Sequence, residues 1–207
     1  MRELDAASQF PDLSWRWHDD IPILKGVYQF KMDYRGYSFQ DNFNLEFVFP
    51  PNYPEKIPLV RELDSKIPSM FHRNPDGCLC LCTPVEQYLI FSKEPTLENY
   101  IYSLLNPYLL SWLWYQRFNE MPWGERHHGV KGLIESYQEL LKLRNIKHTI
   151  HFMYKFVYNR IHNKQECPCG SGLLYKNCHK SIIIDIENYF PKGRLVYDFI
   201  SIKEIVK

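Results

Sequence analysis

The chain has 207 residues, which is room for one domain of ordinary size and a small appendage. Hydrophobic residues make up 45% of it and aromatic residues 16%, enough to build a real core. The net charge of +1 is the sum of an acidic and a basic part. Residues 1–140 carry 13 basic and 19 acidic side chains, whereas residues 141–207 carry 12 basic and 5 acidic ones. The basic C-terminal part indicates contact with an acidic protein surface, nucleic acid or membrane headgroups, or else a solvated helix without a partner.

Composition also bears on the compartment. The first twenty residues contain acidic side chains and no apolar run, so we expect no secretory leader. The longest apolar stretch, around residues 100–115, contains polar residues and Pro107 and is too short to span a membrane. The six cysteines fall in two tight clusters, which in a cytosolic chain indicates chemistry or metal binding rather than disulfides. We therefore predict a cytoplasmic protein with no membrane partner.

The N-terminal half predicts an antiparallel sheet. Residues 1–20 form a short polar segment with two tryptophans. Residues 26–34 and 39–49 alternate as strands do, and Gly36 supplies the turn between them. Residues 57–63 are a third strand candidate. One face of this meander is free to pack against helices. The second strand places four apolar residues on that face: Phe43, Leu45, Phe47 and Phe49.

Helical patterns follow the strands. Thr96 is a suitable N-cap for a helix with apolar residues on one face, and Pro107 should kink or split that helix. Residues 130–145 predict a second helix. Residues 146–162 predict a basic, aromatic helix that connects to the tail.

One short segment carries the residues for thiol chemistry. Cys80 lies six residues after Asn74 and three after Gly77. A cysteine acts as a nucleophile where its thiolate is accessible, and a side-chain amide near it can donate a hydrogen bond to the oxyanion formed when a thioester is attacked. His72 could hold the local backbone instead of taking part in the chemistry.

This segment resembles the active site of ubiquitin-conjugating enzymes, which carry His-Pro-Asn, a Gly, and the catalytic Cys three residues after that Gly. Two departures are that Arg73 stands in place of the proline and that the loop from Asn74 to Cys80 is two residues shorter than usual. Upstream segments match the family in order and spacing: Lys25–Phe30, Phe43–Phe49, the Phe49–Pro54 turn and Ile57–Val60. The resemblance covers residues 15 to 85, and it implies that residues 1–20 hold a truncated version of the family's first helix. It implies catalytic roles for Cys80, Asn74 and His72.

Cys78, Cys80 and Cys82 also permit a metal interpretation. At alternate positions of an extended segment their side chains would point the same way, about 7 Å apart, and could not enclose an ion without help from elsewhere. We prefer a division in which Cys78 and Cys82 are buried and structural and Cys80 is exposed and reactive.

The segment Pro122–Gly129 contains the adjacent pair His127 and His128 near Glu125. Adjacent side chains in an extended loop diverge, which favours a loop pinned by Trp123 and hydrogen-bonded by Glu125. The alternative is that His127 or His128 lines the active site and assists the incoming amine, as the similar stretch in bacterial conjugating-enzyme relatives implies.

The C-terminal cluster predicts a metal centre. Three thiols and one imidazole form the closed tetrahedral shell that zinc favours in structural sites. Gly170 and Gly172 let the backbone turn tightly enough for the ligands to converge. The spacing C-x-C-x8-C-H resembles the SEC-C motif, which implies a small docking element with a structural Zn²⁺. Its ligands would be Cys167, Cys169, Cys178 and His179. We expect this knuckle to fold as a separate small unit, followed by a tail over residues 182–206 that adds a strand or lies on the core.

These expectations combine into an α+β protein with a UBC-like antiparallel meander, helices and a C-terminal zinc knuckle. The predicted divisions are a catalytic domain over residues 1–145, a basic connector over 146–164, and the knuckle and tail over 165–207. The resemblance implies a carrier that holds a protein C-terminus as a thioester on Cys80 and passes it to a target amine. In relatives from CBASS anti-phage operons the carried protein is a CD-NTase, a cyclic-oligonucleotide synthase. The alternatives are a bacterial ubiquitin-like pathway and an inactive binding adaptor, and nucleic acid is not an expected partner.

Overall fold

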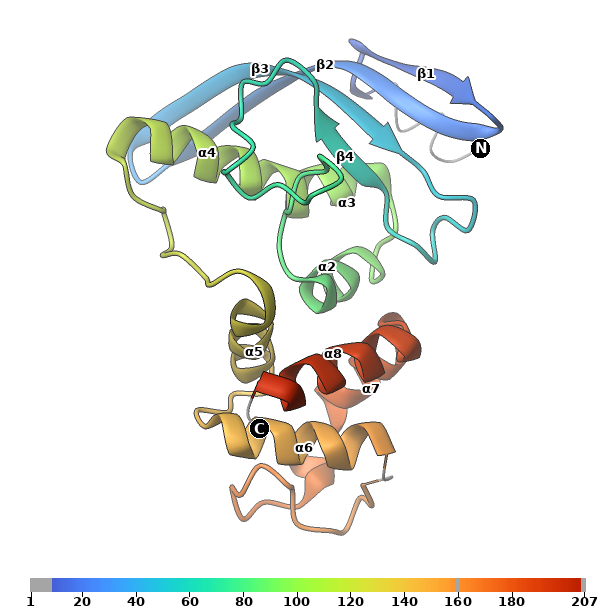
Figure 1. The fold of residues 1–207 in the computed structure, drawn as a ribbon, viewed down its shortest axis with the longest axis vertical. Helices are drawn as coiled ribbons and strands as arrows, with labels where there is room; N and C mark the ends of the chain where they lie inside the picture. Colours follow the sequence, from blue (N-terminus) through green and yellow to red (C-terminus); the bar gives the residue numbers. More distant parts are fainter. Residues whose placement is uncertain (1–8, 159–160, 206–207) are drawn as a thin grey trace. The chain divides into compact units, whose positions relative to one another are not determined.

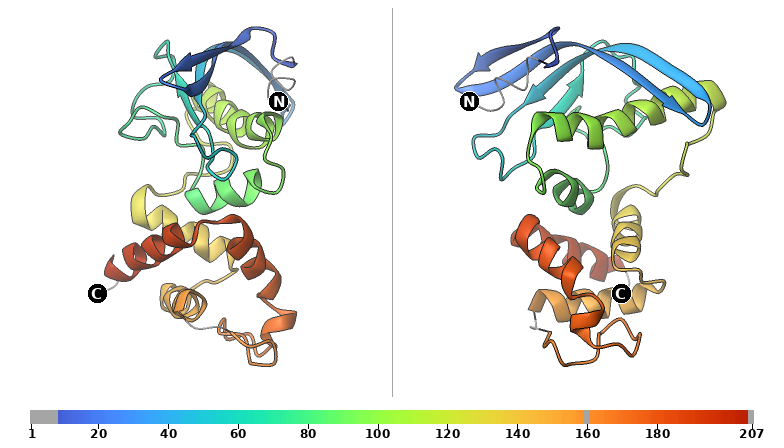
Figure 2. Two further views of the ribbon diagram at one scale, coloured as in Figure 1. Left: turned by 90° about the vertical axis from the view of Figure 1, so that its right-hand side faces the viewer. Right: turned by 180° about the vertical axis from the view of Figure 1, so that it is seen from behind.

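The computed structural model describes residues 9–158 and 161–205. The chain divides into two compact units. The first unit is the described part of Met1–Cys82 together with Ile90–Gly124, and the second is Thr83–Leu89 together with the described part of Glu125–Lys207. Each unit is described by itself (Figures 1 and 2).

A four-stranded antiparallel meander forms the first unit, in the order β1-β2-β3-β4. It consists of β1 (Leu13–His18), β2 (Ile21–Tyr34), β3 (Tyr37–Val48) and β4 (Leu59–Glu62). The predicted turn is confirmed, since Tyr34 pairs with Tyr37 and Gly36 has a positive φ. The four alternating apolar residues predicted for the second strand are all buried. The α+β class and the antiparallel meander are therefore confirmed.

The N-terminal segment corrects the prediction of a first helix. Residues 13–18 form strand β1, which pairs with the beginning of β2 through a turn at Asp19 and Asp20, both at positive φ. Leu13 is buried and Trp15 half-buried on one face of this strand, whereas Ser14 and Arg16 on the other face are exposed, as suits a strand at the sheet edge. Residues 1–8 of the predicted helix lie outside the described residues.

One helical rod packs on the sheet. It begins with α3 (Leu97–Tyr100), passes through a π-helical turn η2 (Ile101–Leu105) and continues as α4 (Asn106–Phe118). Thr96 caps it as predicted, with its side chain accepting a hydrogen bond from the Asn99 N–H at 3.2 Å. The predicted interruption at Pro107 is confirmed, because the π-helical turn ends at Leu105, two residues before this proline, which has no N–H to continue the α pattern. In Figure 1, α4 runs along one face of β2 and β3.

Helices form the second unit: α5 (Gly129–Leu140), α6 (Ile146–Tyr158), η3 (Tyr175–Asn177), α7 (Lys180–Tyr189) and α8 (Lys192–Ile205). Helix α2 (Pro84–Phe91) contributes its first residues to this unit. The prediction that the tail adds a strand is wrong, because the tail forms α7 and α8. Its alternative, that the tail lies on the core, is confirmed: Ile183, Ile186, Phe199 and Ile202 are buried with Phe152 in one cluster.

The two units do not follow the predicted divisions. Helices α5 and α6 pack on each other and on α8, so the predicted connector over residues 146–164 contributes a core helix. The assignment of a catalytic domain to residues 1–145 stays a prediction. In the described ranges 9–158 and 161–205, none of the helices has the length and apolarity that crossing a membrane requires.

Candidate metal centre and cysteine hairpin

The backbone around Cys167 folds so that its ligands converge. Cys167 N donates to the Leu173 carbonyl at 2.8 Å, and Gly170 N returns to the Cys167 carbonyl at 3.1 Å. Gly170 and Gly172 both have positive φ, the conformation that favours glycine and closes this turn. The short helix η3 then brings Cys178 back to the turn, and α7 begins directly after His179.

The four predicted ligands come together. Their ligand atoms all lie within 4.8 Å of one another. The Nδ1 atom of His179 is 3.0 Å from the Cys178 sulfur and 3.3 Å from the Cys167 sulfur, and the sulfurs of Cys169 and Cys178 are 3.6 Å apart. Three soft sulfur donors and one imidazole nitrogen fit a tetrahedral cation of the borderline-soft kind.

The imidazole of His179 is oriented by a residue from another element. Its Nε2 atom lies 2.6 Å from the carbonyl oxygen of Leu141, which accepts only if Nε2 carries the proton. That tautomer leaves the lone pair of Nδ1 directed at the three thiols. Metal-bound histidines are usually held in this way by a partner beyond the ligand shell. No local pattern marks Leu141 as this partner, because the contact is to its backbone carbonyl, 38 residues before His179.

The centre belongs to the core of the second unit. Cys167 and Tyr175 are buried in the same cluster as Phe152, and the Phe152 ring lies 4.9 Å from the His179 ring. Burial also raises the pKa of the Cys167 thiol to about 12, so this ligand holds its proton until a cation replaces it. The expectation of a separately folded knuckle is therefore wrong, since the ligands pack on α5, α6 and α7.

The segment around Cys80 is a small β-hairpin in the first unit. Arg73 and Leu79 pair across it, Cys80 N donates to the His72 carbonyl at 2.7 Å, and Asn74 N donates to the Cys78 carbonyl at 2.8 Å. Gly77, at positive φ, closes the turn. The hairpin is attached to the sheet because Leu79 N donates to the carbonyl of Val60 in β4 at 2.8 Å.

The register places His72, not Asn74, directly opposite Cys80. Asn74 is exposed at the turn, where it faces Cys78 through the backbone. The main-chain carbonyl of His72 holds the strand of Cys80, a contact that any residue at this position would make. The chemical roles of Asn74 and His72 stay predictions.

Arg73, which replaces the proline of the resembled motif, anchors the hairpin. Its Nη2 atom lies 2.8 Å from Glu62 Oε2 and donates to the Ile67 carbonyl at 3.0 Å. The Glu62 side chain is fully buried and also accepts hydrogen bonds from the N–H groups of Asp64 and Ile67. The ion pair between Arg73 and Glu62 was not predicted from the sequence. The replacement of the motif's proline by arginine was the one sequence feature that pointed to a special role for this position.

The three cysteines of the hairpin differ in burial. Cys78 is buried, whereas Cys80 and Cys82 are both partly exposed. Burial of Cys78 agrees with the expected division, and Cys82 is more open than expected. Partial burial raises the pKa of Cys80 above its ordinary value.

The histidine loop is pinned within the second unit. Arg126 forms ion pairs with Glu86 and Glu139, and His127 Nδ1 lies 2.6 Å from Glu135 Oε1. The pinned loop preferred from the sequence agrees with these contacts, and the predicted Trp123 packs its ring 5.6 Å from that of Tyr34 in the first unit. The ion pairs of Arg126 and the contact of His127 with Glu135 were not predicted. The role of His127 or His128 at an active site stays a prediction.

The comparisons with known proteins identify one element of this chain. Residues 164–181 match the SEC-C motif, and this segment contains the four residues of the cluster that could hold a metal ion. No curated protein and no solved structure matches the chain. The second unit therefore carries a SEC-C motif with a Cys₃His cluster at its centre.

Proposed function

We propose that the first unit is a UBC-like domain that carries a protein C-terminus as a thioester on Cys80 and transfers it to an amine. The observation that carries this proposal is the hairpin directly after the four-stranded meander. It presents a partly exposed Cys80 three residues after a turn glycine and is attached to β4 through Leu79. The spacing resembles that of ubiquitin-conjugating enzymes, and the helical rod on one face of the sheet agrees with that architecture.

The proposed chemistry has two steps. In the first, the Cys80 thiolate attacks the carbonyl carbon of an activated C-terminus, a C–S bond forms, and the activating group leaves with the electrons of the broken bond. In the second, an amine attacks the same carbon, a C–N bond forms, and the C–S bond breaks to return the thiolate while the amine loses a proton. A separate protein must supply the activated acyl group.

The raised pKa of Cys80 bears on the first step. Because the thiol is mostly protonated at neutral pH, it would not react rapidly with small electrophiles, and its deprotonation would accompany docking of the activated partner. Asn74 would stabilise the oxyanion once its exposed side chain turns toward the loaded sulfur. His72 would act as a positioning residue through its carbonyl.

We further propose that the Cys₃His cluster holds one Zn²⁺ in a structural role. Four protein ligands fill a tetrahedral shell and leave no open position for substrate or water. The second unit would then serve for docking. For the carried protein, a CD-NTase of a CBASS system is our first choice and a ubiquitin-like protein the second. A binding adaptor without transfer activity is the remaining candidate, and the raised pKa of Cys80 is the observation that favours it.

The test is adduct formation with the purified partner and its activating protein, followed on non-reducing gels and by intact mass. Cys80→Ala should abolish a thiol-sensitive adduct, and Cys80→Ser should give one that resists reductant, because an oxygen ester replaces the thioester. Cys78→Ser and Cys82→Ser are matched controls that should retain the adduct. An adduct that persists in Cys80→Ala and disappears in Cys78→Ser would move the reactive thiol and refute the assignment.

The identity of the partner has its own measurement. If the carried protein is a CD-NTase, the mass should rise by the full synthase, and deleting the last residues of the synthase should remove the adduct. An adduct that survives this deletion, or that carries only a small ubiquitin-like protein, would exclude the CBASS assignment. If no adduct forms with either partner while both bind, the adaptor is the better description.

A further inference from the structure

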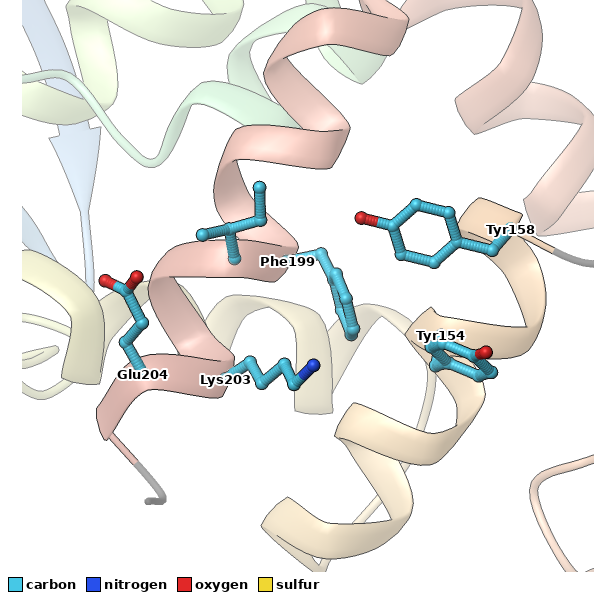
Figure 3. Close-up of a pocket in the computed structure, with 6 residues that line it drawn as sticks. Tyr154, Tyr158, Phe199, Lys203 and Glu204 are labelled. Atoms are coloured by element: carbon cyan, nitrogen blue, oxygen red, sulfur yellow. The ribbon is translucent and has the colours of Figure 1, made fainter.

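The groove between α6 and α8 in the second unit exposes aromatic side chains but selects no ligand (Figure 3). The rings of Tyr154 and Tyr158 have centroids 5.5 Å apart and contact the buried Phe199 beneath them. The lining also carries one lysine and one glutamate, whose charges oppose each other. Because its rings pack on one another and its charges are balanced, this groove indicates no particular partner.

Strand β1 in the first unit offers a more specific surface. It is the last strand on its side of the sheet, and no other strand of the described residues pairs with its outer edge. The opposite edge is partly covered, because Leu79 N donates to the Val60 carbonyl in β4 at 2.8 Å. Strand β1 contains neither proline nor lysine, residues that commonly protect an exposed edge from pairing. It is therefore suited to receive another strand.

The main-chain groups of β1 alternate between the two sides of the strand. Val27 N donates to the Asp12 carbonyl at 3.3 Å, so Asp12 and every second residue after it bond to β2. The N–H of Leu13 is already bonded to the Phe10 carbonyl at 2.9 Å, which leaves its carbonyl available. The residues that direct main-chain groups away from the sheet are Leu13, Trp15 and Trp17.

The same three residues form the apolar face of β1. Leu13 is buried, and the ring of Trp15 lies 5.0 Å from that of Phe49. Trp17 is 69% exposed. Its indole thus lies at the rim of the sheet, where it can cover an apolar residue of an incoming strand.

We propose that β1 pairs antiparallel with β1 of a second copy of this chain, with Trp15 opposite Trp15 at the two-fold axis. In such an isologous contact every other pairing occurs twice. This register places Leu13 opposite Trp17, an apolar pair whose main-chain groups both point outward. It also places Asp12 opposite His18, an acidic and a basic side chain, so the strand is complementary to itself. The proposal does not depend on acyl transfer by Cys80.

Neighbouring registers fit less well. A shift by one residue would place outward main-chain groups opposite inward ones. A shift by two residues in one direction would place Arg16 opposite Arg16 and Asp12 opposite Asp20, and like charges directly opposite are destabilising. The same shift in the other direction would place Pro11 opposite Trp17, where the proline has no N–H to donate.

Sedimentation velocity of the full-length protein measures the association. A pair of 6-residue strands is a small interface, so we expect a concentration-dependent equilibrium between monomer and dimer. Trp17→Pro removes an outward N–H and leaves the bonds to β2 in place, whereas Trp17→Val keeps this N–H. Trp17→Pro should weaken the dimer about tenfold more than Trp17→Val, because it removes one main-chain hydrogen bond from each half of the contact.

Charge variants test the register. The dimer of His18→Lys should be at least about fivefold tighter than that of His18→Asp, because the two side chains would face Asp12 of the other copy with opposite charges. In an Asp12→Lys background this order should reverse. Asp12 also accepts a hydrogen bond from Gln29 at 2.6 Å, but that bond is the same in the two variants compared within each background. Within one chain Asp12 and His18 lie about 20 Å apart along the strand, too far for an unscreened charge effect.

Circular dichroism and tryptophan fluorescence verify that each variant is folded. A monomer at every concentration, which is the result expected if another segment or protein occupies β1, would overturn the proposal. Equal effects of Trp17→Pro and Trp17→Val, or the same order of the His18 variants in both backgrounds, would also overturn it.

Discussion

Breaking the ion pair between Arg73 and Glu62 should destabilise the first unit strongly. Glu62 is fully buried, Arg73 is nearly so, and their charged atoms lie 2.8 Å apart. Removing one member leaves the other as an uncompensated buried charge, which costs about 3–5 kcal/mol. We therefore expect Glu62→Gln and Arg73→Met each to lower the free energy of unfolding by about that amount. The double variant should lose much less than the sum, because it leaves no buried charge.

The assay is urea unfolding followed by tryptophan fluorescence. All five tryptophans lie in the first unit, so this signal reports on it alone: Trp15, Trp17, Trp112, Trp114 and Trp123. The matched control is the partly exposed pair of Arg61 and Glu46 on neighbouring strands, where Arg61→Met should cost only about 0–1 kcal/mol. Equal small losses for Arg73→Met and Arg61→Met, or strict additivity in the double variant, would refute the anchoring role of the pair.

Three further predictions follow from the two units. If the cluster holds the proposed Zn²⁺, Cys169→Ser should abolish metal binding and lower the stability of the whole second unit while the tryptophan unfolding curve stays unchanged. A loss of hydrogen-exchange protection confined to residues 165–180 would contradict the shared core. The rate of alkylation of Cys80 should rise about tenfold per pH unit from pH 7 to 9 without levelling, because the raised pKa of this thiol leaves little thiolate in that range. The rate is measured by mass spectrometry with Cys80→Ala as the control, and a plateau below pH 8 would contradict a raised pKa. Gly132→Ala should destabilise the second unit, because an added Cβ would lie 1.8 Å from the His127 carbonyl, whereas Gly193→Ala meets nothing within 4 Å and should be tolerated.

Local sequence signals predicted the sheet and the helical rod well. The alternation of Phe43, Leu45 and Phe47 marks a strand with one buried face, Gly36 marks its turn, and Thr96 marks the helix start. Each of these features depends on residues within a few positions of one another. The Cys₃His cluster was predictable for the same reason, because its four ligands lie within 13 residues and their order is distinctive.

Features that depend on distant packing were not predicted. The run Ser181–Ile186 contains three consecutive isoleucines, which favour a strand locally. In the fold it is helical, because Ile183 and Ile186, three positions apart, reach one buried cluster with Phe152. The partner of His179 is likewise a carbonyl supplied by the chain after α5. No local pattern specifies either contact.

The anchor at Arg73 explains how the hairpin can differ from the resembled motif and still hold Cys80 in place. A proline at this position restricts the backbone by its ring alone. Arg73 instead fixes the hairpin from outside, through Glu62 at the end of β4 and the carbonyl of Ile67 in the following loop. The main-chain bond from Leu79 to Val60 attaches the second arm to the same strand. Both arms of the hairpin are thus tied to β4, so a shorter loop between Asn74 and Cys80 can keep a defined register without the proline.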